Sequence, residues 1–184
     1  MKTELQKMLA GELYSAGDAT LTAMRISCRQ LLQQFNNAPV DDADMKRSFL
    51  QQLFGGLGKQ IDVQSPFYCD YGSNILAGEN LFVNFNCTFL DCATITFGDN
   101  VFIAPHVQLY TAHHPIIASE RIKGPELASP IFIGNNVWLG GGVIVCPGVR
   151  IGDNTTIGAG SVVTKDIPAN VVAAGNPCRV IKHL

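Results

Sequence analysis

Two adjacent histidines, His113 and His114, open the part of the chain whose residue types are best suited to chemistry. The segment 112–130 reads AHHPIIASERIKGPELASP and contains three prolines and one glycine. Histidine titrates near neutrality and is the usual general base for taking a proton from a hydroxyl group. Long excursions from a regular scaffold often carry function. The segment therefore predicts a site for proton removal, and a surface or hydrogen-bonded histidine is the alternative interpretation.

The scaffold that must position these histidines repeats every six residues between Ile131 and Ala173. An aliphatic residue begins each unit, and a small or β-branched residue closes it four places later. The first positions are Ile133, Leu139, Val145, Ile151, Ile157 and Val163. Hexapeptide repeats predict a parallel β-helix, an all-β solenoid in which three strands and their corners make one coil. A repeated turn signal in a β-sandwich is the less favoured alternative.

The same register returns upstream, for example at Phe97, Ile103 and Leu109. Slips of two residues separate the upstream blocks, and we interpret them as bulged corners. Side chains of a strand alternate between its two faces, so each first position points inward and the residue before it points outward. Counted from Leu109, His113 falls on an inward position and His114 on an outward one. His114 is therefore the histidine expected to meet a substrate.

Several outward positions of the repeats carry apolar residues. They are Phe102, Trp138, Ile144 and Val162. A row of exposed apolar side chains along one edge of a solenoid needs a partner surface or a ligand. We expect a homo-oligomer of closed rotational symmetry, with sites between its subunits.

Residues 1–57 differ from residues 58–184, because they are rich in Leu, Met, Gln and charged residues. Their apolar spacing predicts two or three short amphipathic helices, with Asp41 or Asp42 as an N-cap and Gly55-Gly56 ending the last helix. We expect this segment to cap the first coil of a β-helix domain that spans 58–184 and carries the protruding loop 112–130.

The composition narrows the classes of partner. The chain has 184 residues, a formal net charge of −2 and no run rich in Lys or Arg, which argues against nucleic acid and an anionic membrane as partners. The first residues, MKTELQKMLAGELY, carry charges where a signal peptide needs an apolar core, so we expect a cytoplasmic protein. The six cysteines include no C-x-x-C pair and are interpreted as reduced and packed.

Four segments resemble the hexapeptide-repeat sugar O-acetyltransferases, in particular the maltose and galactoside acetyltransferases. They are CDYGSNI, NFNCTFLD, TAHHP and the run IGNNVWLGGGVIVCPGVRIGDNTTIGAGSVVTKDIPANVVAAGNPCRVIKHL, and the MLAGELY opening is also similar to that family. The resemblance covers nearly the whole chain. It implies a left-handed β-helix, a homotrimer with active sites between neighbouring subunits, and transfer of an acetyl group from acetyl-CoA to a sugar hydroxyl. It implies no permanently bound cofactor and no metal.

The resemblance also implies roles for single residues. His114 takes the place of the catalytic base, and Asn84 and Asp70 lie where the acceptor sugar binds. The positions that match the family's coenzyme A contacts, or supply cations for its phosphates, are Trp138, Gly141, Ala159, Thr164, Lys165, Arg179 and Lys182. Arg25 and Glu126 are weaker acceptor candidates, and we interpret them as surface residues.

The chemistry of this transfer needs a base and a donor for an oxyanion. A base must take the proton of the sugar hydroxyl as the hydroxyl oxygen attacks the thioester carbonyl. A backbone N–H within Gly140–Gly142 is a candidate donor to the tetrahedral oxyanion, because glycine lets a ligand approach closely. Direct attack in a ternary complex is the simplest scheme. An acyl-enzyme on Cys92 or Cys146 is the alternative.

The chain departs from the galactoside branch on the acceptor side. It has Asp70 where that branch has serine, and Cys92 where that branch has a second carboxylate directly after the one that corresponds to Asp91. The maltose type, with its C-D-Y-G segment, therefore matches better than the galactoside type, and the acceptor sugar itself stays open.

Two other function classes remain. A zinc-dependent carbonic anhydrase-like solenoid needs three histidine ligands, and His106, His113 and His114 are expected near one corner, although the inward phase of His113 argues against this site. A non-catalytic scaffold is the other class, but it gives no reason for the histidine loop, the glycine triplet and the C-terminal cations to occur together.

Overall fold

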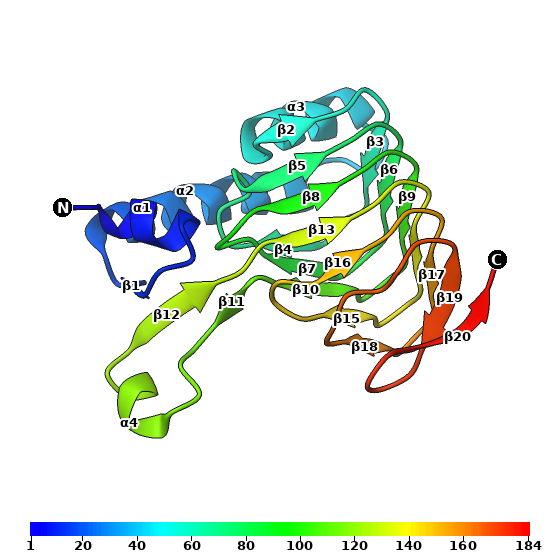
Figure 1. Cartoon of the computed structure of the whole chain (residues 1–184). Coiled ribbons are helices and arrows are strands. Elements are labelled where there is room, and N and C mark those ends of the chain that lie inside the picture. Colours follow the sequence, from blue (N-terminus) through cyan, green and yellow to red (C-terminus); the bar gives the residue numbers. More distant parts are fainter.

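The hexapeptide pattern folds into a left-handed parallel β-helix of about six coils, as seen in a computed structural model that describes all residues from Met1 to Leu184 (Figure 1). The predicted fold class is therefore confirmed. Each coil passes through three walls, and strands of successive coils pair in parallel within each wall. No helix combines the length and the apolar composition that crossing a membrane would require.

The walls are three parallel sheets. The first wall contains β2 (Gly56–Leu57), β5 (Ile75–Ala77), β8 (Ile95–Phe97), β13 (Ile131–Ile133) and β16 (Arg150–Ile151). The second wall contains β3 (Ile61–Val63), β6 (Leu81–Val83), β9 (Val101–Ile103), β14 (Trp138–Leu139), β17 (Thr156–Ile157) and β19 (Val171–Ala174), and β20 (Arg179–His183) adds to its end as an antiparallel strand. The third wall contains β4 (Phe67–Cys69), β7 (Cys87–Leu90), β10 (Gln108–Tyr110), β15 (Ile144–Val145) and β18 (Val162–Val163).

The corners between walls stack into three edges that run along the solenoid. The asparagine edge joins the first wall to the second and includes residues 78–80, 98–100, 134–136, 152–154 and 168–170. The glycine edge joins the second wall to the third and includes residues 84–86, 104–107, 140–143 and 158–161. The histidine edge joins the third wall back to the first and includes residues 70–74, 91–94, 111–130, 146–149 and 164–166.

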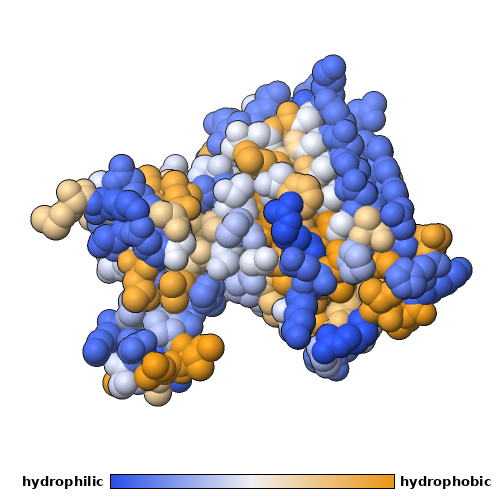
Figure 2. All heavy atoms as spheres, viewed as in Figure 1, coloured by the Kyte–Doolittle hydropathy of each residue, from blue (hydrophilic) through white to orange (hydrophobic).

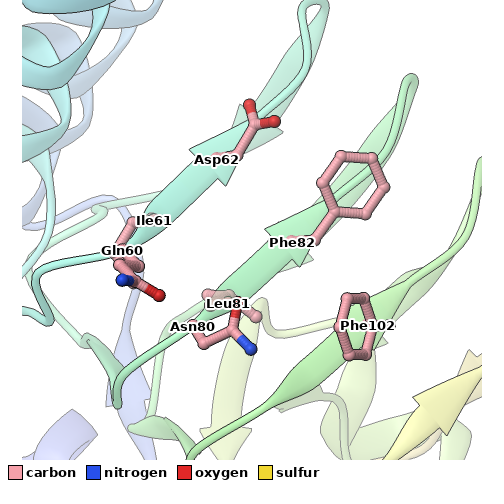
Figure 3. Close-up of a pocket in the computed structure, with 7 residues that line it drawn as sticks. All are labelled: Gln60, Ile61, Asp62, Asn80, Leu81, Phe82 and Phe102. Atoms are coloured by element: carbon pink, nitrogen blue, oxygen red, sulfur yellow. The ribbon is translucent and has the colours of Figure 1, made fainter.

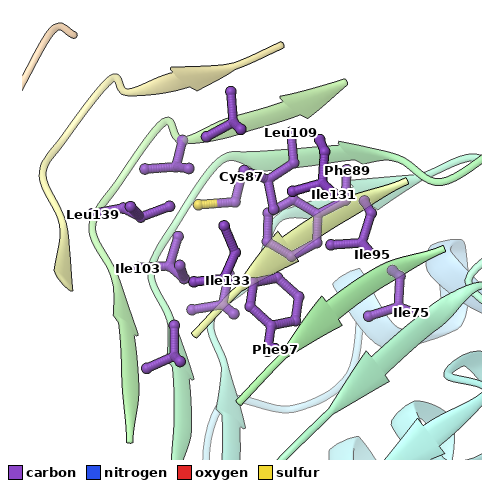
Figure 4. Packing of buried hydrophobic residues seen from close by; sticks show 14 of the residues in the cluster. Ile75, Cys87, Phe89, Ile95, Phe97, Ile103, Leu109, Ile131, Ile133 and Leu139 are labelled. Carbon is purple, nitrogen blue, oxygen red and sulfur yellow. The ribbon is translucent and has the colours of Figure 1, made fainter. Parts of the chain in front are cut away.

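The predicted inward positions form the core. Ile133, Leu139 and Val145 are fully buried, as are the later first positions Ile151, Ile157 and Val163. Figure 4 shows Ile133, Leu139 and the rings of Phe89 and Phe97 among the side chains that fill the space between the walls. The rings of Phe67 and Phe89 meet edge to face with their centroids 5.1 Å apart, a favoured aromatic geometry.

Helices cover the first coil, as the amphipathic pattern predicts. They are α1 (Glu4–Leu9), α2 (Ala19–Asn36) and α3 (Ala43–Leu53). The side chain of Asp42 accepts a hydrogen bond from the Met45 N–H, so the prediction of an N-cap at this position is confirmed. Apolar side chains of α2 and α3, such as Leu32 and Leu50, belong to the same buried cluster as the coils. The helices therefore cover the open end of the core.

The protruding loop is an ordered hairpin rather than an irregular excursion. It contains β11 (Ala112–His113), the short helix α4 (Ala118–Arg121) and β12 (Pro125–Ala128). Strand β12 pairs with β11 on one side and with β1 (Tyr14–Ser15) on the other, and all pairs are antiparallel. Figure 1 shows the hairpin standing away from the solenoid beside the N-terminal segment. The N-terminal segment thus has a role beyond capping, because it fixes the base of the loop.

Candidate active site

The predicted site residues lie on two different edges of the same chain. Asp70, His114, Thr164 and Lys165 belong to the histidine edge, whereas Asn84, Gly141 and Ala159 belong to the glycine edge. The third wall separates these edges. Its strand β7 has four residues that rise about 3.3 Å each, so the edges are roughly 10 Å or more apart. One chain therefore does not bring the predicted base beside Asn84.

His114 is exposed at the start of the loop, and its ring is oriented by the loop itself. Its Nδ1 atom lies 3.3 Å from the backbone oxygen of Pro125 on the opposite strand of the hairpin. A carbonyl oxygen can only accept, so this contact requires the proton to be on Nδ1 and leaves the Nε2 lone pair free. In this tautomer the imidazole can take a proton from a hydroxyl group.

His113 does not occupy an inward position of the solenoid, so this prediction from the phase is wrong. The six-residue register ends at Thr111, where the chain leaves the coil, and His113 instead lies in β11 of the hairpin. It is half-buried, and its Nε2 atom lies 3.2 Å from the hydroxyl oxygen of Ser129. His113 therefore fastens the two strands at the base of the loop.

The N-terminal segment packs against the base of the loop. Tyr14 of β1 is buried, and its hydroxyl donates a hydrogen bond of 2.8 Å to the carboxylate of Glu126 on β12. Burial raises the pKa of Tyr14 far above its usual value, so the phenol stays protonated and remains a donor. A small apolar cluster that includes Met8, Leu21 and Ala128 packs around this contact.

Asp70 lies among charged and polar groups from three segments. Its carboxylate is 3.5 Å from the thiol of Cys92, and it interacts electrostatically with Arg25 and Glu126. Burial raises the pKa of Asp70, and the Cys92 hydrogen bond and the Arg25 charge oppose that effect. Asp70 also lines a groove of about 420 Å³ together with Arg29, Tyr68 and Thr88, so its oxygens can accept hydrogen bonds from the hydroxyl groups of a ligand.

Arg25 and Glu126 are not ordinary surface residues, in contrast to the interpretation from the sequence. Both are half-buried beside Asp70. The Arg25 guanidinium donates hydrogen bonds of 2.6 Å to the hydroxyl of Tyr71 and to the backbone oxygen of Ala16. These contacts fix the place of a positive charge that interacts with Asp70, and they depend on residues outside α2, so the sequence pattern of α2 alone did not reveal them.

The cysteines near the pocket are poor nucleophiles. Burial and the nearby Asp70 charge raise the pKa of the Cys92 thiol well above its usual value, and burial raises the pKa of Cys146 as well. The thiolate is the reactive form of cysteine, so a raised pKa leaves less of it near neutral pH. The raised pKa values therefore argue against an acyl-enzyme on either cysteine.

The glycine edge offers free backbone donors. The Gly140 N–H donates to Ile157 and the Gly142 N–H donates to Pro105, but the Gly141 N–H has no hydrogen-bond partner in the chain. The Ala159 N–H, one coil further along the same edge, is also unpaired. A Cβ at Gly140 would lie 2.6 Å from the Ala159 nitrogen, so Gly140 serves the stacking of coils. Of the triplet, Gly141 is the residue able to donate to a ligand.

An aromatic surface borders the glycine edge on the second wall. Phe82, Phe102 and Trp138 occupy paired positions on three neighbouring strands and point outward. With Asn84 they line a groove of about 490 Å³. A second groove of about 590 Å³ continues from Phe82 and Phe102 to Asp62, and Figure 3 shows these three side chains on the same face.

The predicted row of outward apolar residues is therefore two rows. Phe102 and Trp138, which are 46% and 55% exposed, lie on the second wall, whereas Ile144 and Val162 lie on the third wall. The phase shows that these side chains point outward, but it does not show which wall each strand occupies. Both rows flank the glycine edge.

The remaining coenzyme A candidates lie toward the C-terminal end of the solenoid. Arg179 and Lys182 are exposed on β20 at the end of the second wall, and Thr164 and Lys165 are exposed on the histidine edge. The segment before β20 returns to the glycine edge, because the Cys178 N–H donates to Val162 and the Val162 N–H donates to Gly175. Trp138, Gly141, Ala159 and Arg179 thus follow one side of the molecule.

Comparison with known proteins places the whole chain in one family. Residues 7–58 match the maltose acetyltransferase hexapeptide capping motif, and residues 130–165 match the bacterial transferase hexapeptide with six repeats. The galactoside O-acetyltransferase of Escherichia coli is 45% identical over 97% of this chain and 88% of its own. The chain belongs to the hexapeptide-repeat sugar O-acetyltransferases.

Solved structures of this acetyltransferase family have the same fold. A maltose O-acetyltransferase from Clostridium difficile is 56% identical and superposes with a TM-score of 0.99 over 100% of this chain and 98% of its own. A galactoside acetyltransferase in complex with coenzyme A is 44% identical, with a TM-score of 0.96 over 100% of this chain and 92% of its own. Both comparisons include the helical segment and the loop.

The three histidines considered as zinc ligands do not gather in this acetyltransferase chain. His106 lies on the glycine edge, whereas His113 and His114 lie on the histidine edge, so the expectation of one corner is wrong. No three His, Cys, Asp or Glu side chains are grouped closely enough to hold a metal ion. The phase could not separate these edges because it carries no information about which corner a residue occupies.

Sequence reasoning missed several residues of this acetyltransferase that hold the surroundings of Asp70 and the base of the loop. They are Tyr14, Tyr71, Asp91 and Thr111. One signal was present, because the two-residue slips of the register fall at the corners 70–74 and 91–94. These wider corners carry Asp70, Tyr71 and Asp91, so the slips of the register locate the corners of the candidate site.

Proposed function

We propose that this acetyltransferase moves the acetyl group of acetyl-CoA to a hydroxyl of a small sugar, with His114 as the general base. The orientation of His114 is the observation that carries this proposal. Its Nδ1–H bond to Pro125 leaves Nε2 free, and the same loop places Glu126 beside Asp70. A base and hydrogen-bonding carboxylates next to one pocket suit a polyhydroxylated acceptor.

The reaction follows from these groups as a direct transfer. The Nε2 atom of His114 accepts the proton of the sugar hydroxyl while the hydroxyl oxygen attacks the thioester carbonyl carbon. The unpaired N–H of Gly141 donates to the oxyanion that forms. When the tetrahedral intermediate collapses, the carbon–sulfur bond breaks, and the proton on His114 passes to the departing thiolate of coenzyme A.

The complete site requires a second subunit in this proposal. The base and Asp70 lie on the histidine edge, whereas Asn84 and Gly141 lie on the glycine edge, across the third wall. Contact between the histidine edge of one subunit and the glycine edge of the next would unite them. Such a contact joins unlike surfaces and closes into a ring. The two edges bound the third wall, so in the proposed homotrimer the third wall of each chain faces the axis of the ring.

The exposed apolar residues support this homotrimer. The tip of the loop carries Ile116, Ile117 and Ile122, of which Ile116 is 94% exposed. Figure 2 shows apolar residues at this projecting tip. The groove along Phe82 and Phe102 is an apolar surface beside the glycine edge, the edge that would meet the loop. The basic residues Arg121 and Lys123 of the loop are complementary in charge to Asp62 in that groove.

Acetyl-CoA would then lie between subunits. The glycine edge of one subunit supplies Trp138 and the N–H groups of Gly141 and Ala159, with Arg179 and Lys182 as cations for the phosphates. The histidine edge of the neighbour supplies Thr164 and Lys165. The relative bound to coenzyme A, which matches the full length of this chain, supports this half of the proposal.

The acceptor is proposed to be a sugar of the maltose or glucose type. Asp70 and Glu126 offer carboxylate oxygens, Arg25 offers a fixed charge between them, and Asn84 offers an amide from the neighbouring subunit. The similarity to a maltose O-acetyltransferase at 56% identity supports this class over galactosides.

Thiol release from acetyl-CoA by the purified protein tests the function. Glucose, maltose, galactosides and aminosugars form the acceptor panel. His114→Ala should lower kcat by about 10²-fold to 10⁴-fold, as loss of a general base does, while the affinity for coenzyme A stays unchanged. His113→Gln is the matched control, because glutamine can still bond to Ser129, and it should stay active. Full activity of His114→Ala, or no turnover of any sugar by the wild type, would refute the proposal.

A further inference from the structure

Two fully buried polar side chains lie on the histidine edge and take no part in the proposed chemistry. They are Asp91 and Thr111, both 0% exposed. Buried polar groups are costly unless they are hydrogen-bonded, so their partners show what they hold in place. Asp91 follows β7 and Thr111 follows β10, so the two residues occupy the same corner in successive coils.

Asp91 holds the corner that carries Asp70. Its Oδ1 atom accepts the N–H groups of Asp70 and Tyr71 at 3.0 and 2.8 Å. Its Oδ2 atom accepts the N–H of Asn74 at 3.3 Å, and the Asn74 side chain donates back to the Asp91 carbonyl at 2.7 Å. The corner 70–74 is thus wrapped around one carboxylate, which sets the direction in which the Asp70 side chain leaves the backbone.

Thr111 makes the equivalent contacts one coil further on. Its hydroxyl accepts the N–H of Ala93 at 2.9 Å and donates to the carbonyl of Leu90 at 2.6 Å. Its own carbonyl accepts the N–H of Ser129 at 2.9 Å, where the hairpin returns to the coil. The Ser129 hydroxyl in turn contacts His113, the neighbour of His114.

These contacts form one continuous chain from the corner 70–74, the acceptor corner that carries Asp70, to the loop. It runs from the corner 70–74 through Asp91 to Ala93, through Thr111 to Ser129, and ends at the base of the hairpin. We propose that Asp91 and Thr111 are positioning residues that set the acceptor corner with Asp70 in register with the hairpin that carries His114. The inference rests on the proposed function, because it assumes that Asp70 and His114 serve one site.

The shape of the solenoid explains why buried side chains, and not the backbone alone, hold these corners in place. The corners 70–74 and 91–94 carry the two extra residues of the register slips, so several of their backbone N–H groups bond to side chains instead of to the backbone of the next coil. A side chain from the following coil supplies the missing partners. The Thr111 hydroxyl accepts from Ala93 and donates to Leu90, so it fastens both ends of the corner after β7 to the residue that begins the loop, which an apolar residue of equal shape cannot do.

Thr111→Val is the decisive variant, because valine keeps the shape and removes the hydroxyl. We expect kcat/KM for the acceptor to fall by about tenfold to a hundredfold, as small misplacements of reacting groups do, with KM for acetyl-CoA changed by less than about twofold. Thr111→Ser restores the hydroxyl and should return the acceptor kcat/KM to near the wild-type value. Asp91→Asn should act in the same direction, and the double variant should lose less than the product of the single losses.

Thr155→Val is the matched control. Thr155 is also fully buried, and its hydroxyl donates to the Pro168 carbonyl at 2.9 Å, but it lies beside the asparagine edge. It should lose stability without losing acceptor kcat/KM. If Thr111→Val folds and keeps the wild-type acceptor kcat/KM, or if KM for acetyl-CoA rises as much as that for the acceptor, the two residues have only a structural role.

Hydrogen exchange gives a second readout that needs no activity. In Thr111→Val the amides of the corner 70–74 and of the loop 112–130 should both exchange about tenfold faster or more, because the lost hydroxyl bonds hold the segment that carries Asp91 against the residue that begins the loop. In Thr155→Val they should exchange as in the wild type. If the wild type turns over no sugar, the proposed function fails while this comparison still decides the inference: unchanged exchange in both segments overturns it.

Discussion

At the scale of single residues, the buried polar groups of the histidine edge are held by hydrogen bonds to the backbone and not by ion pairs. The ion pairs of the chain, Lys2 with Glu12 and Lys7 with Glu4, both lie in the N-terminal segment. Asp91 is stabilised by backbone N–H groups instead. Burial raises its pKa to about 6 from the ordinary 3.8, and the N–H groups of Tyr71 and Asn74 oppose that rise. Placing this carboxylate inside the solenoid therefore has an energetic cost when it is ionised.

The cost predicts how Asp91→Asn changes the dependence of stability on pH. Between about pH 4 and 6 the folded protein keeps a proton on Asp91 that the unfolded chain has released, so lowering the pH favours the folded state of the wild type. Asparagine does not titrate. The free energy of unfolding of the wild type minus that of Asp91→Asn should therefore rise by up to about 3 kcal/mol from pH 7 to pH 4. Urea unfolding of both proteins at several pH values measures it, and a constant difference would contradict the assignment.

At the scale of elements, the asparagine edge shows how coils are kept in register. Asn80, Asn100, Asn136, Asn154 and Asn170 all have positive φ, between 55° and 60°. The side-chain amide of each donates to the side-chain oxygen of the next at 2.8 to 3.0 Å. Asparagine tolerates the left-handed conformation better than other residues with a Cβ, and its amide can both donate and accept. One residue type thus supplies the turn and the contact between coils.

Substitution of Asn136 separates these two contributions. Asn136→Ala loses both hydrogen bonds between the asparagine side chains of successive coils. It also puts alanine, which tolerates the left-handed region less well than asparagine, at a positive φ. The free energy of unfolding should fall by about 2–3 kcal/mol in total. Asn136→Gly loses the same hydrogen bonds without that strain, so it should be about 1 kcal/mol more stable than the alanine variant. Urea unfolding of the two variants measures the difference. Equal stabilities would mean that the turn conformation contributes nothing.

For the strands and corners, the sequence predicts which side chains are buried but not which wall a strand occupies. The period of six identified the inward residues, such as Ile133 and Leu139, because burial of alternate side chains is a local property of each strand. It also located the wide corners through its slips. It failed at His113, because the chain leaves the coil at Thr111 and a phase counted past that point has no meaning. It also could not place His106 relative to His114, since the wall that a strand occupies depends on all preceding corners.

The candidate site could be predicted less completely than the fold. The resemblance singled out His114, Asp70 and Asn84, but the contacts that join the N-terminal segment to their surroundings link residues that are distant in sequence and follow no period. Tyr14 meets Glu126 across 112 residues, and Arg25 meets Tyr71 across 46. Such contacts depend on how the N-terminal segment packs against the loop, which the local pattern does not encode.

At the scale of the whole molecule, the separation of the two edges predicts how inactive subunits behave when mixed. His114→Ala damages the histidine edge, and Asn84→Ala damages the glycine edge. If each site joins the histidine edge of one subunit to the glycine edge of the next, a mixed trimer contains some sites in which both edges are intact. Random mixing in equal amounts should leave roughly a quarter of the sites intact. No such recovery is possible if each chain forms its own site.

Unfolding and refolding the two variants together, followed by thiol-release assays, measures the recovery. The matched control mixes His114→Ala with Asp70→Ala. Both residues lie on the histidine edge, so every site in that mixture still carries one damaged residue, and activity should stay at the level of the separate variants. Recovery in the first mixture and none in the second would identify the paired edges as well as the sharing of sites. Recovery in neither mixture, from protein that refolds to a trimer, would mean that Asn84 and His114 act in the same subunit or in different sites, and the composite site would have to be abandoned.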